Sequence, residues 1–164
     1  MNDHFLQAIS ILILLGVANG VPIFAARLFG KRFDTSLDGG LKLPDKRPLF
    51  GPSKTVRGLV LSVVCTALAA PLLGFEWIIG AGLASVSMCG DLLSSFIKRR
   101  LGLRVHSQAL VLDQVPESLL PLLVLRTQLG LGYGDIAIIV AAFIVLELLL
   151  SRLLFRLHIR DRPY

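Results

Sequence analysis

The sequence predicts an all-α, polytopic membrane protein with about five transmembrane helices, its N-terminus outside and its C-terminus in the cytoplasm. The chain of 164 residues is 54% hydrophobic and has a mean hydropathy of +0.75, more apolar than soluble domains usually are. Uncharged runs long enough to cross a bilayer recur along it. The positive charges between these runs are unevenly distributed, and this gives the orientation. We expect residues 1–164 to form a single integral-membrane domain.

The uncharged run Phe5–Ala26 defines the first span, and Leu59–Phe75 defines the second. The third begins at an aromatic residue suited to a membrane interface, and the fourth begins in "LVLDQVPESLLPLL". The fifth contains Ile136–Leu150, in which Glu147 is the one charged residue. The predicted spans cover about residues 5–29, 58–75, 77–97, 112–130 and 133–154.

The 17 lysine and arginine residues fall into three clusters that leave only Arg126 outside them. Eight lie between Arg27 and Arg57, four follow the third span and end at Arg104, and four begin at Arg152. With alternating spans, these clusters share one face of the membrane, which the positive-inside rule assigns to the cytoplasm. Residues of about 30–58 therefore form a cytoplasmic loop, and we expect any chemistry on that side.

Besides Glu147 in the fifth span, acidic residues lie inside the third and fourth predicted spans. Asp91 is 14 positions after Trp77, about 21 Å along a helix, which places it in the inner third of a hydrocarbon core of about 30 Å. Asp91, Ser95 and Lys98 share one helical stripe by their spacing. An acid facing lipid would cost about 2.5–3.5 kcal/mol, so these groups must face each other, a cation or water.

The fourth span carries Asp113 and Glu117 at a similar depth. The two acids share a helical face if the helix runs through Asp113, whereas Pro116 favours a helix that starts near that position. Carboxylates that converge repel each other unless a positive charge lies between them. Oxygen ligands with access to water suit Mg²⁺, which takes one or two carboxylates together with substrate phosphates. The alternative is that Asp91 pairs structurally with Lys98 or a nearby arginine.

The cytoplasmic loop ends in "GPSKTVRG", which has the composition of a phosphate-binding loop. Lys54 and Arg57 can neutralise phosphate oxygens, and Thr55 can donate a hydrogen bond. The spacing is not that of a Walker A motif. The alternative is a basic juxtamembrane loop that only sets topology or contacts anionic lipids.

Several stretches together resemble one family. "GDLLSSFIKRRLG" (residues 90–102) followed by "DQ" resembles the signature of CTP-dependent cytidylyltransferases that make CDP-activated lipids, and most closely that of the CDP-archaeol synthase family. "VANGVP" (residues 17–22) and "PDKRPLFGPSKTVRG" (residues 44–58) resemble that family's first-helix element and cytoplasmic loop. The sequence departs from the family's Asp-Gln-x-Asp motif at Pro116, and Glu117 follows one position later. Either Glu117 restores the carboxylate or the second acid is lost.

The resemblance implies transfer of a cytidylyl group from CTP to a lipid phosphate, giving CDP-lipid and pyrophosphate, with Mg²⁺ as the cofactor. It implies that Asp91 and Asp113, with Glu117, hold the metal and that Asp91, Asp113 and Lys98 are catalytic. Ser95 would orient a phosphate or a metal-bound water, and Asn19 would bond either the nucleotide or a neighbouring helix. The residues that the resemblance places at the nucleotide and phosphates are Gly51, Lys54, Thr55, Arg57, Ser95, Arg99 and Asn19.

The partners that follow are CTP, a lipid phosphate within the bilayer and membrane lipids, with no nucleic acid. The sequence is also compatible with a homodimer. Two other functions are weighed against the enzyme. An ion- or proton-coupled transporter would use membrane carboxylates, but the chain shows no inverted repeat. A non-catalytic relative that binds lipids as an accessory protein is favoured only by Pro116.

Overall fold

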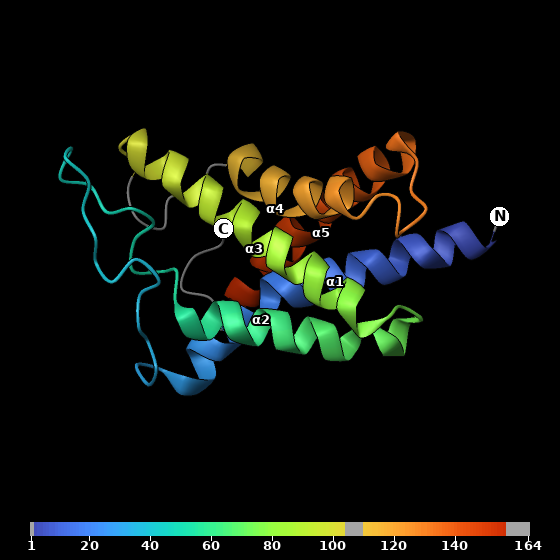
Figure 1. The fold of residues 1–164 in the computed structure, drawn as a ribbon, viewed down its shortest axis with the longest axis horizontal. Coiled ribbons are helices and arrows are strands. Elements are labelled where there is room, and N and C mark those ends of the chain that lie inside the picture. Colours follow the sequence, from blue (N-terminus) through green and yellow to red (C-terminus); the bar gives the residue numbers. More distant parts are fainter. Residues whose placement is uncertain (1, 104–109, 157–164) are drawn as a thin grey trace.

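The computed structural model describes residues 2–103 and 110–156, and within these ranges the protein is all-α (Figure 1). Two predicted cation clusters extend to Arg104 and Arg162, which lie outside the described residues. The five α-helices are α1 at Asn2–Phe29, α2 at Val56–Ala69, α3 at Trp77–Arg100, α4 at Leu110–Val124 and α5 at Tyr133–Arg156. A short 3₁₀ helix, η1, lies between α2 and α3 at Pro71–Leu73.

Four segments of the described chain are long and apolar enough to cross a membrane. The segments are His4–Phe29, Val56–Leu73, Trp77–Arg100 and Tyr133–Leu153. The predicted fourth span, 112–130, is shorter in the structure, because α4 has 15 residues and ends in turns after Val124. A helix of that length covers about 22 Å, less than a hydrocarbon core of about 30 Å. The prediction of five helices is therefore confirmed, and four segments of the described chain have membrane-spanning length, the second of them being α2 continued by η1.

Helix α3 lies at the centre of the bundle and packs against α4, α2 and α1. Glycines let it approach its neighbours closely, as small residues do in membrane bundles. A Cβ at Gly80 would lie 2.6 Å from the carbonyl oxygen of Thr66 on α2, and a Cβ at Gly90 would lie 2.3 Å from the carbonyl oxygen of Pro116 on α4. The backbone of α4 therefore passes directly against the backbone of α3 at Gly90.

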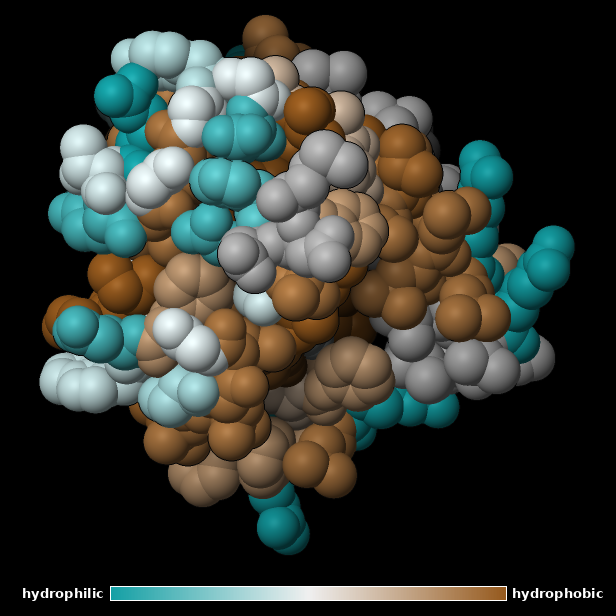
Figure 2. Space-filling view, turned by 90° about the vertical axis from the view of Figure 1, so that its right-hand side faces the viewer, coloured by the Kyte–Doolittle hydropathy of each residue, from teal (hydrophilic) through white to brown (hydrophobic). Residues whose placement is uncertain are grey.

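The outer surface is largely apolar, as expected for helices that face lipid. Figure 2 shows apolar side chains covering much of the end of the bundle at which α1 begins. Large hydrophobic side chains are exposed along the helices. Examples are Leu6, Val64, Leu68, Ile138 and Val145. Their exposure is compatible with a folded protein only if lipid covers them.

The loop between α1 and α2 lies at the opposite end of the bundle from the N-terminus (Figure 1). Isolated bridges join Ser36 to Thr55 and Lys42 to Pro48, so the loop is folded rather than extended. Arg47 donates hydrogen bonds to two carbonyl oxygens at the end of α3, those of Arg100 at 2.6 Å and Arg99 at 3.3 Å. The loop therefore packs on the end of α3 that carries the three consecutive cations.

Candidate active site

A cavity of about 1040 Å³ lies among the helices where the loop meets them. Residues from α1, the loop, α2, α3, α4 and α5 line it. Of the described residues in its lining, five are basic and five are acidic. Of the predicted site residues, Gly51 alone does not line it, although its neighbours Phe50 and Pro52 do. The predicted residues in the lining are Asn19, Lys54, Thr55, Arg57, Asp91, Ser95, Lys98, Arg99, Asp113 and Glu117.

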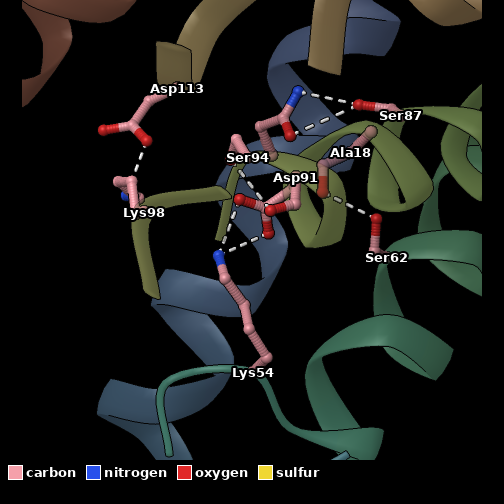
Figure 3. Close-up of polar contacts among 9 residues, drawn as sticks. Ala18, Lys54, Ser62, Ser87, Asp91, Ser94, Lys98 and Asp113 are labelled. Carbon is pink, nitrogen blue, oxygen red and sulfur yellow. Dashed lines mark hydrogen bonds and ion pairs between the residues drawn. The ribbon is translucent and has the colours of Figure 1, made fainter. Parts of the chain in front are cut away.

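Asp91 forms an ion pair with Lys54 inside this cavity. The ammonium nitrogen of Lys54 lies 2.6 Å from Oδ1 and 2.5 Å from Oδ2 of Asp91, and Figure 3 shows the lysine reaching from the loop to α3. Both side chains are mostly buried, with 22% and 23% exposed. The alternative interpretation of the sequence was a purely structural ion pair between Asp91 and Lys98 or a nearby arginine. In the structure, the partner of Asp91 is Lys54, from the loop with the composition of a phosphate-binding loop.

A second ion pair joins α3 to α4. The ammonium of Lys98 lies 2.5 Å from Oδ1 of Asp113, and Figure 3 shows Asp113 facing Lys98 from its own helix. Lys98 follows Asp91 by two turns on α3, so the two ion pairs lie along one stripe. The cavity therefore holds two lysine–aspartate pairs whose four members come from three different elements.

Two further acids, Glu117 and Glu147, line the same cavity from α4 and α5. Glu117 is 6% exposed. Within residues 2–103 and 110–156, no three His, Cys, Asp or Glu side chains are grouped closely enough to hold a metal ion. Because Asp91 and Asp113 each face a lysine, the set Asp91, Asp113 and Glu117 is not assembled as a cage in this structure. Its metal role stays a prediction.

The donor chemistry nevertheless suits Mg²⁺. Asp91 and Asp113 supply carboxylate oxygens in one cavity that also admits water-sized groups. Magnesium is usually bound through one or two carboxylates, with waters and substrate phosphates completing its shell. In the substrate-free arrangement, the two lysine ammonium groups provide the positive charge that such carboxylates require.

Arg57 lines the cavity as predicted and also contacts the end of α1. Its guanidinium donates to the carbonyl oxygen of Gly30 at 3.1 Å and to that of Arg32, and it lies 3.5 Å from Asp34. It also lies over the ring of Phe29, 6.0 Å from the centroid. A guanidinium is attracted to carbonyls at a helix C-terminus because these carry partial negative charge. Arg57 therefore fixes the end of α1 while lining the cavity.

Thr55 and Asn19 also have structural partners. Thr55 is the N-cap of α2, and its hydroxyl oxygen accepts a hydrogen bond from the N–H of Gly58 at 3.1 Å. The side-chain amide of Asn19 donates to the hydroxyl of Ser87 at 3.2 Å, which joins α1 to α3. Of the two roles predicted for Asn19, the structure contains the bond to a neighbouring helix. Lys54 is thus the loop residue whose charged group faces the acids directly.

Comparisons with known proteins agree on one family. The family model described as "CarS-like: CDP-archaeol synthase" matches residues 73–164. The CDP-archaeol synthase of Sulfolobus acidocaldarius is 32% identical over 160 residues, covering 93% of this chain and 98% of that protein. The CDP-archaeol synthase of Sulfurisphaera tokodaii is 34% identical over 156 residues, covering 90% and 89%. This chain belongs to the CDP-archaeol synthase family.

A solved structure agrees with this assignment to the CDP-archaeol synthase family. It is described as an intramembrane enzyme for archaeal membrane lipids biosynthesis. It superposes with a TM-score of 0.66 at 28% identity and covers 85% of this chain and 91% of that one. The resemblance found in the motifs is thus confirmed over most of the chain.

The departure from the family motif lies at a tight contact. Pro116 is inside α4, and its carbonyl oxygen is the group closest to a Cβ built on Gly90. The prediction that the helix starts near Pro116 is wrong, because α4 begins at Leu110 and runs through Asp113, with Pro116 as its seventh residue. At this interior position the proline removes one helical N–H donor. Glu117, the next residue, lines the cavity. The substitution therefore leaves a carboxylate in the CDP-archaeol synthase cavity, one position later on α4.

Sequence reasoning missed several residues of the site. Arg27 and Ser151 line the cavity, and Ser151 follows Glu147 by one helical turn on α5. That spacing was the available signal for Ser151. Asp38, which is outside the predicted site, accepts hydrogen bonds from the N–H groups of Phe50 and Gly51 across the loop. Gly51 has a φ of +101° and donates its N–H to Asp38, so its place in the family motif reflects loop geometry.

Proposed function

We propose that this chain transfers the cytidylyl group of CTP to a lipid phosphate and releases pyrophosphate, at the cavity described above. Membership of the CDP-archaeol synthase family supports the reaction, and the name of its relatives points to an archaeol-type lipid phosphate. The observation that carries the proposal is the pair of lysine–aspartate contacts inside a cavity among membrane helices. Such an arrangement offers both anion-binding and cation-binding groups to a polyphosphate.

The proposed active site faces the cytoplasm. The cation clusters from Arg27 to Arg57 and from Lys98 onward belong to the end of the bundle that carries the loop, and positive charge is retained on the cytoplasmic side. The N-terminus then lies outside, and the whole chain is one membrane domain. The packing of α4 on α3 brings Asp113 and Glu117 beside α3, where a lipid headgroup and water-soluble CTP can meet.

The chemistry needs alignment and charge neutralisation more than a base. A phosphate monoester has a second pKa of about 6, so the lipid phosphate is largely a dianion at neutral pH. One of its oxygens attacks the α-phosphorus of CTP and forms a new P–O bond, while the bond to the pyrophosphate oxygen breaks. Holding both polyanions in line removes most of the entropic barrier.

Different residues of the cavity bind the phosphates and the metal ion. Lys54 and Lys98 move their ammonium groups from the aspartates to phosphate oxygens, and Arg99 adds charge from the end of α3. Asp91 and Asp113, once the lysines have moved, would hold Mg²⁺, with Glu117 beside them. A metal ion held there would supply stabilisation of the negative charge that develops on the phosphates. Ser95, which is buried in the lining, orients a phosphate or a water molecule.

Metal dependence is the first prediction. Purified protein with labelled CTP, Mg²⁺ and an archaeol-type lipid phosphate is expected to form CDP-lipid and pyrophosphate in equal amounts. Chelation of the metal with EDTA should lower the rate at least about a hundred-fold, because the charge on transferring phosphoryl groups then lacks its main counter-charge. Re-addition of Mg²⁺ should restore the rate. Absence of product with every lipid phosphate tested, from folded protein, would contradict the proposed function.

The Glu117→Gln variant asks whether this acid replaces the missing aspartate of the family motif. If Glu117 supplies a metal ligand, its amide variant loses charge but keeps its size, and the Mg²⁺ concentration for half-maximal rate should rise about ten-fold or more. The measurement is a magnesium titration of CTP turnover. The matched control is Gln128→Glu, which changes amide to acid in the exposed turns after α4. An unchanged titration in Glu117→Gln would remove this acid from the metal site.

A further inference from the structure

The carboxylate of Asp38 organises the loop that carries Lys54. Its Oδ1 accepts hydrogen bonds from the hydroxyl of Ser36 at 2.5 Å and from the N–H of Gly40 at 3.0 Å. Its Oδ2 accepts from the N–H groups of Phe50 at 3.0 Å and Gly51 at 2.9 Å. One side chain thus joins the start of the loop to a segment that lies 12 and 13 positions later.

Two residues next to Asp38 hydrogen-bond the backbone of Lys54: Leu37, which precedes Asp38 in the chain, and Gly51, which donates a hydrogen bond to its carboxylate. Leu37, the residue before Asp38, donates its N–H to the carbonyl oxygen of Lys54 at 2.7 Å. The N–H of Lys54 in turn donates to the carbonyl oxygen of Gly51 at 3.2 Å. Removing the carboxylate of Asp38 would therefore weaken the two backbone hydrogen bonds that fix the position of the Cα atom of Lys54.

Asp38 does not line the cavity, so it acts on the site through Lys54. A lysine side chain is long and flexible, and the direction in which it points depends on how its backbone is held. We propose that Asp38 is a positioning residue that holds the loop so that Lys54 reaches Asp91 and, during turnover, the phosphates of CTP. The second half of this inference rests on the proposed function.

The need for a carboxylate follows from the four donors. Burial alone would raise the pKa of the Asp38 carboxyl, but hydrogen bonds from Ser36, Gly51, Phe50 and Gly40 hold that pKa well below its usual range. The group is therefore charged at neutral pH, and both of its oxygens accept. An asparagine could offer only one acceptor oxygen, and its NH₂ group would face N–H donors.

A double-mutant cycle separates positioning from general damage. In the native background, Asp38→Asn should lower kcat/KM for CTP about ten-fold or more, because charge-assisted hydrogen bonds that hold Lys54 are lost. In the Lys54→Met background, the same substitution should lower the residual kcat/KM less than about two-fold. A loss of equal size in both backgrounds, or no loss in the native one, would overturn the proposal.

Hydrogen–deuterium exchange tests the loop without relying on catalysis. Asp38→Asn should speed exchange of the backbone amides of Phe50, Gly51 and Lys54 in the detergent-solubilised protein and leave α2 and α3 unchanged. The control is Asp45→Asn in the same loop, where an exposed ion pair to Arg100 is weakened. If these amides exchange as slowly in Asp38→Asn as in the wild type, the positioning role is wrong even where CTP turnover is observed. If the wild-type protein shows no turnover but Asp38→Asn shows the faster exchange, only the proposed function is wrong.

Discussion

Asp91→Asn is expected to lower kcat/KM for CTP at least about a thousand-fold. The variant keeps the size of the side chain but removes the charge that pairs with Lys54 and that would hold Mg²⁺ against the CTP phosphates. Loss of a group that stabilises charge in the transition state typically costs about 10²–10³ in rate, and an uncompensated ammonium left in the cavity adds to it. The measurement is steady-state formation of CDP-lipid by the purified variant.

A control on the same helix separates chemistry from folding. Glu76 is exposed at the N-cap of α3, makes no side-chain capping hydrogen bond and lies at the opposite end of the helix from the cavity. Glu76→Gln should turn over CTP at the wild-type rate, and both variants should elute from size-exclusion chromatography as the wild type does. If Asp91→Asn keeps a rate within about ten-fold of the wild type, Asp91 is not a metal or catalytic residue.

Gly90→Ala is expected to cost the folded protein about 3 kcal/mol or more. The added Cβ would lie 2.3 Å from the carbonyl oxygen of Pro116 and 2.8 Å from the backbone nitrogen of Glu117. These are backbone atoms of α4, so the clash is relieved only by moving the helix away from α3. Such a shift would also separate Asp113 from Lys98, so both thermal stability and CTP turnover should fall.

The matched variant for this test is Gly82→Ala, on the same helix. A Cβ there would meet only the methyl carbons of Leu125, at 3.7 and 3.8 Å, which is ordinary van der Waals contact. Because alanine favours a helix over glycine by about 1 kcal/mol, this variant should unfold at the wild-type temperature or above it. Thermal unfolding in detergent compares the two. Equal melting temperatures for both variants would show that α4 does not pack on Gly90 as described.

Much of the architecture was predictable because a helix that crosses a membrane requires a long run of apolar residues, which is visible in the sequence. The ends of α1, α3 and α5 follow the long uncharged runs and the charges that interrupt them. The length of α4 was overestimated, because the predicted span was carried through residues 125–130, where the backbone turns. Arg126, Thr127 and Gln128 already interrupt the apolar run there, so hydropathy ends close to where the helix does, at Val124.

The site was predictable as a set of residues but not as a set of contacts. Helical spacing correctly placed Asp91 and Lys98 along one stripe of α3, and both line the cavity. Spacing says nothing about what faces that stripe, so the pairing of Asp91 with Lys54 depended on the loop. The loop conformation depends on Asp38, which bonds residues far from it in sequence. Arg57 likewise meets the end of α1, a contact that no local pattern contains.

Among the residues that the structure describes, five basic and five acidic side chains line the cavity, and this has a consequence for ligand binding. A nucleotide that enters must compete with ion pairs that the protein already makes with itself, so part of each new attraction is offset by an attraction that is lost. Under the proposed mechanism the lysine–aspartate pairs would form again as pyrophosphate departs, so we expect modest affinity for the nucleotide and ready release of the product.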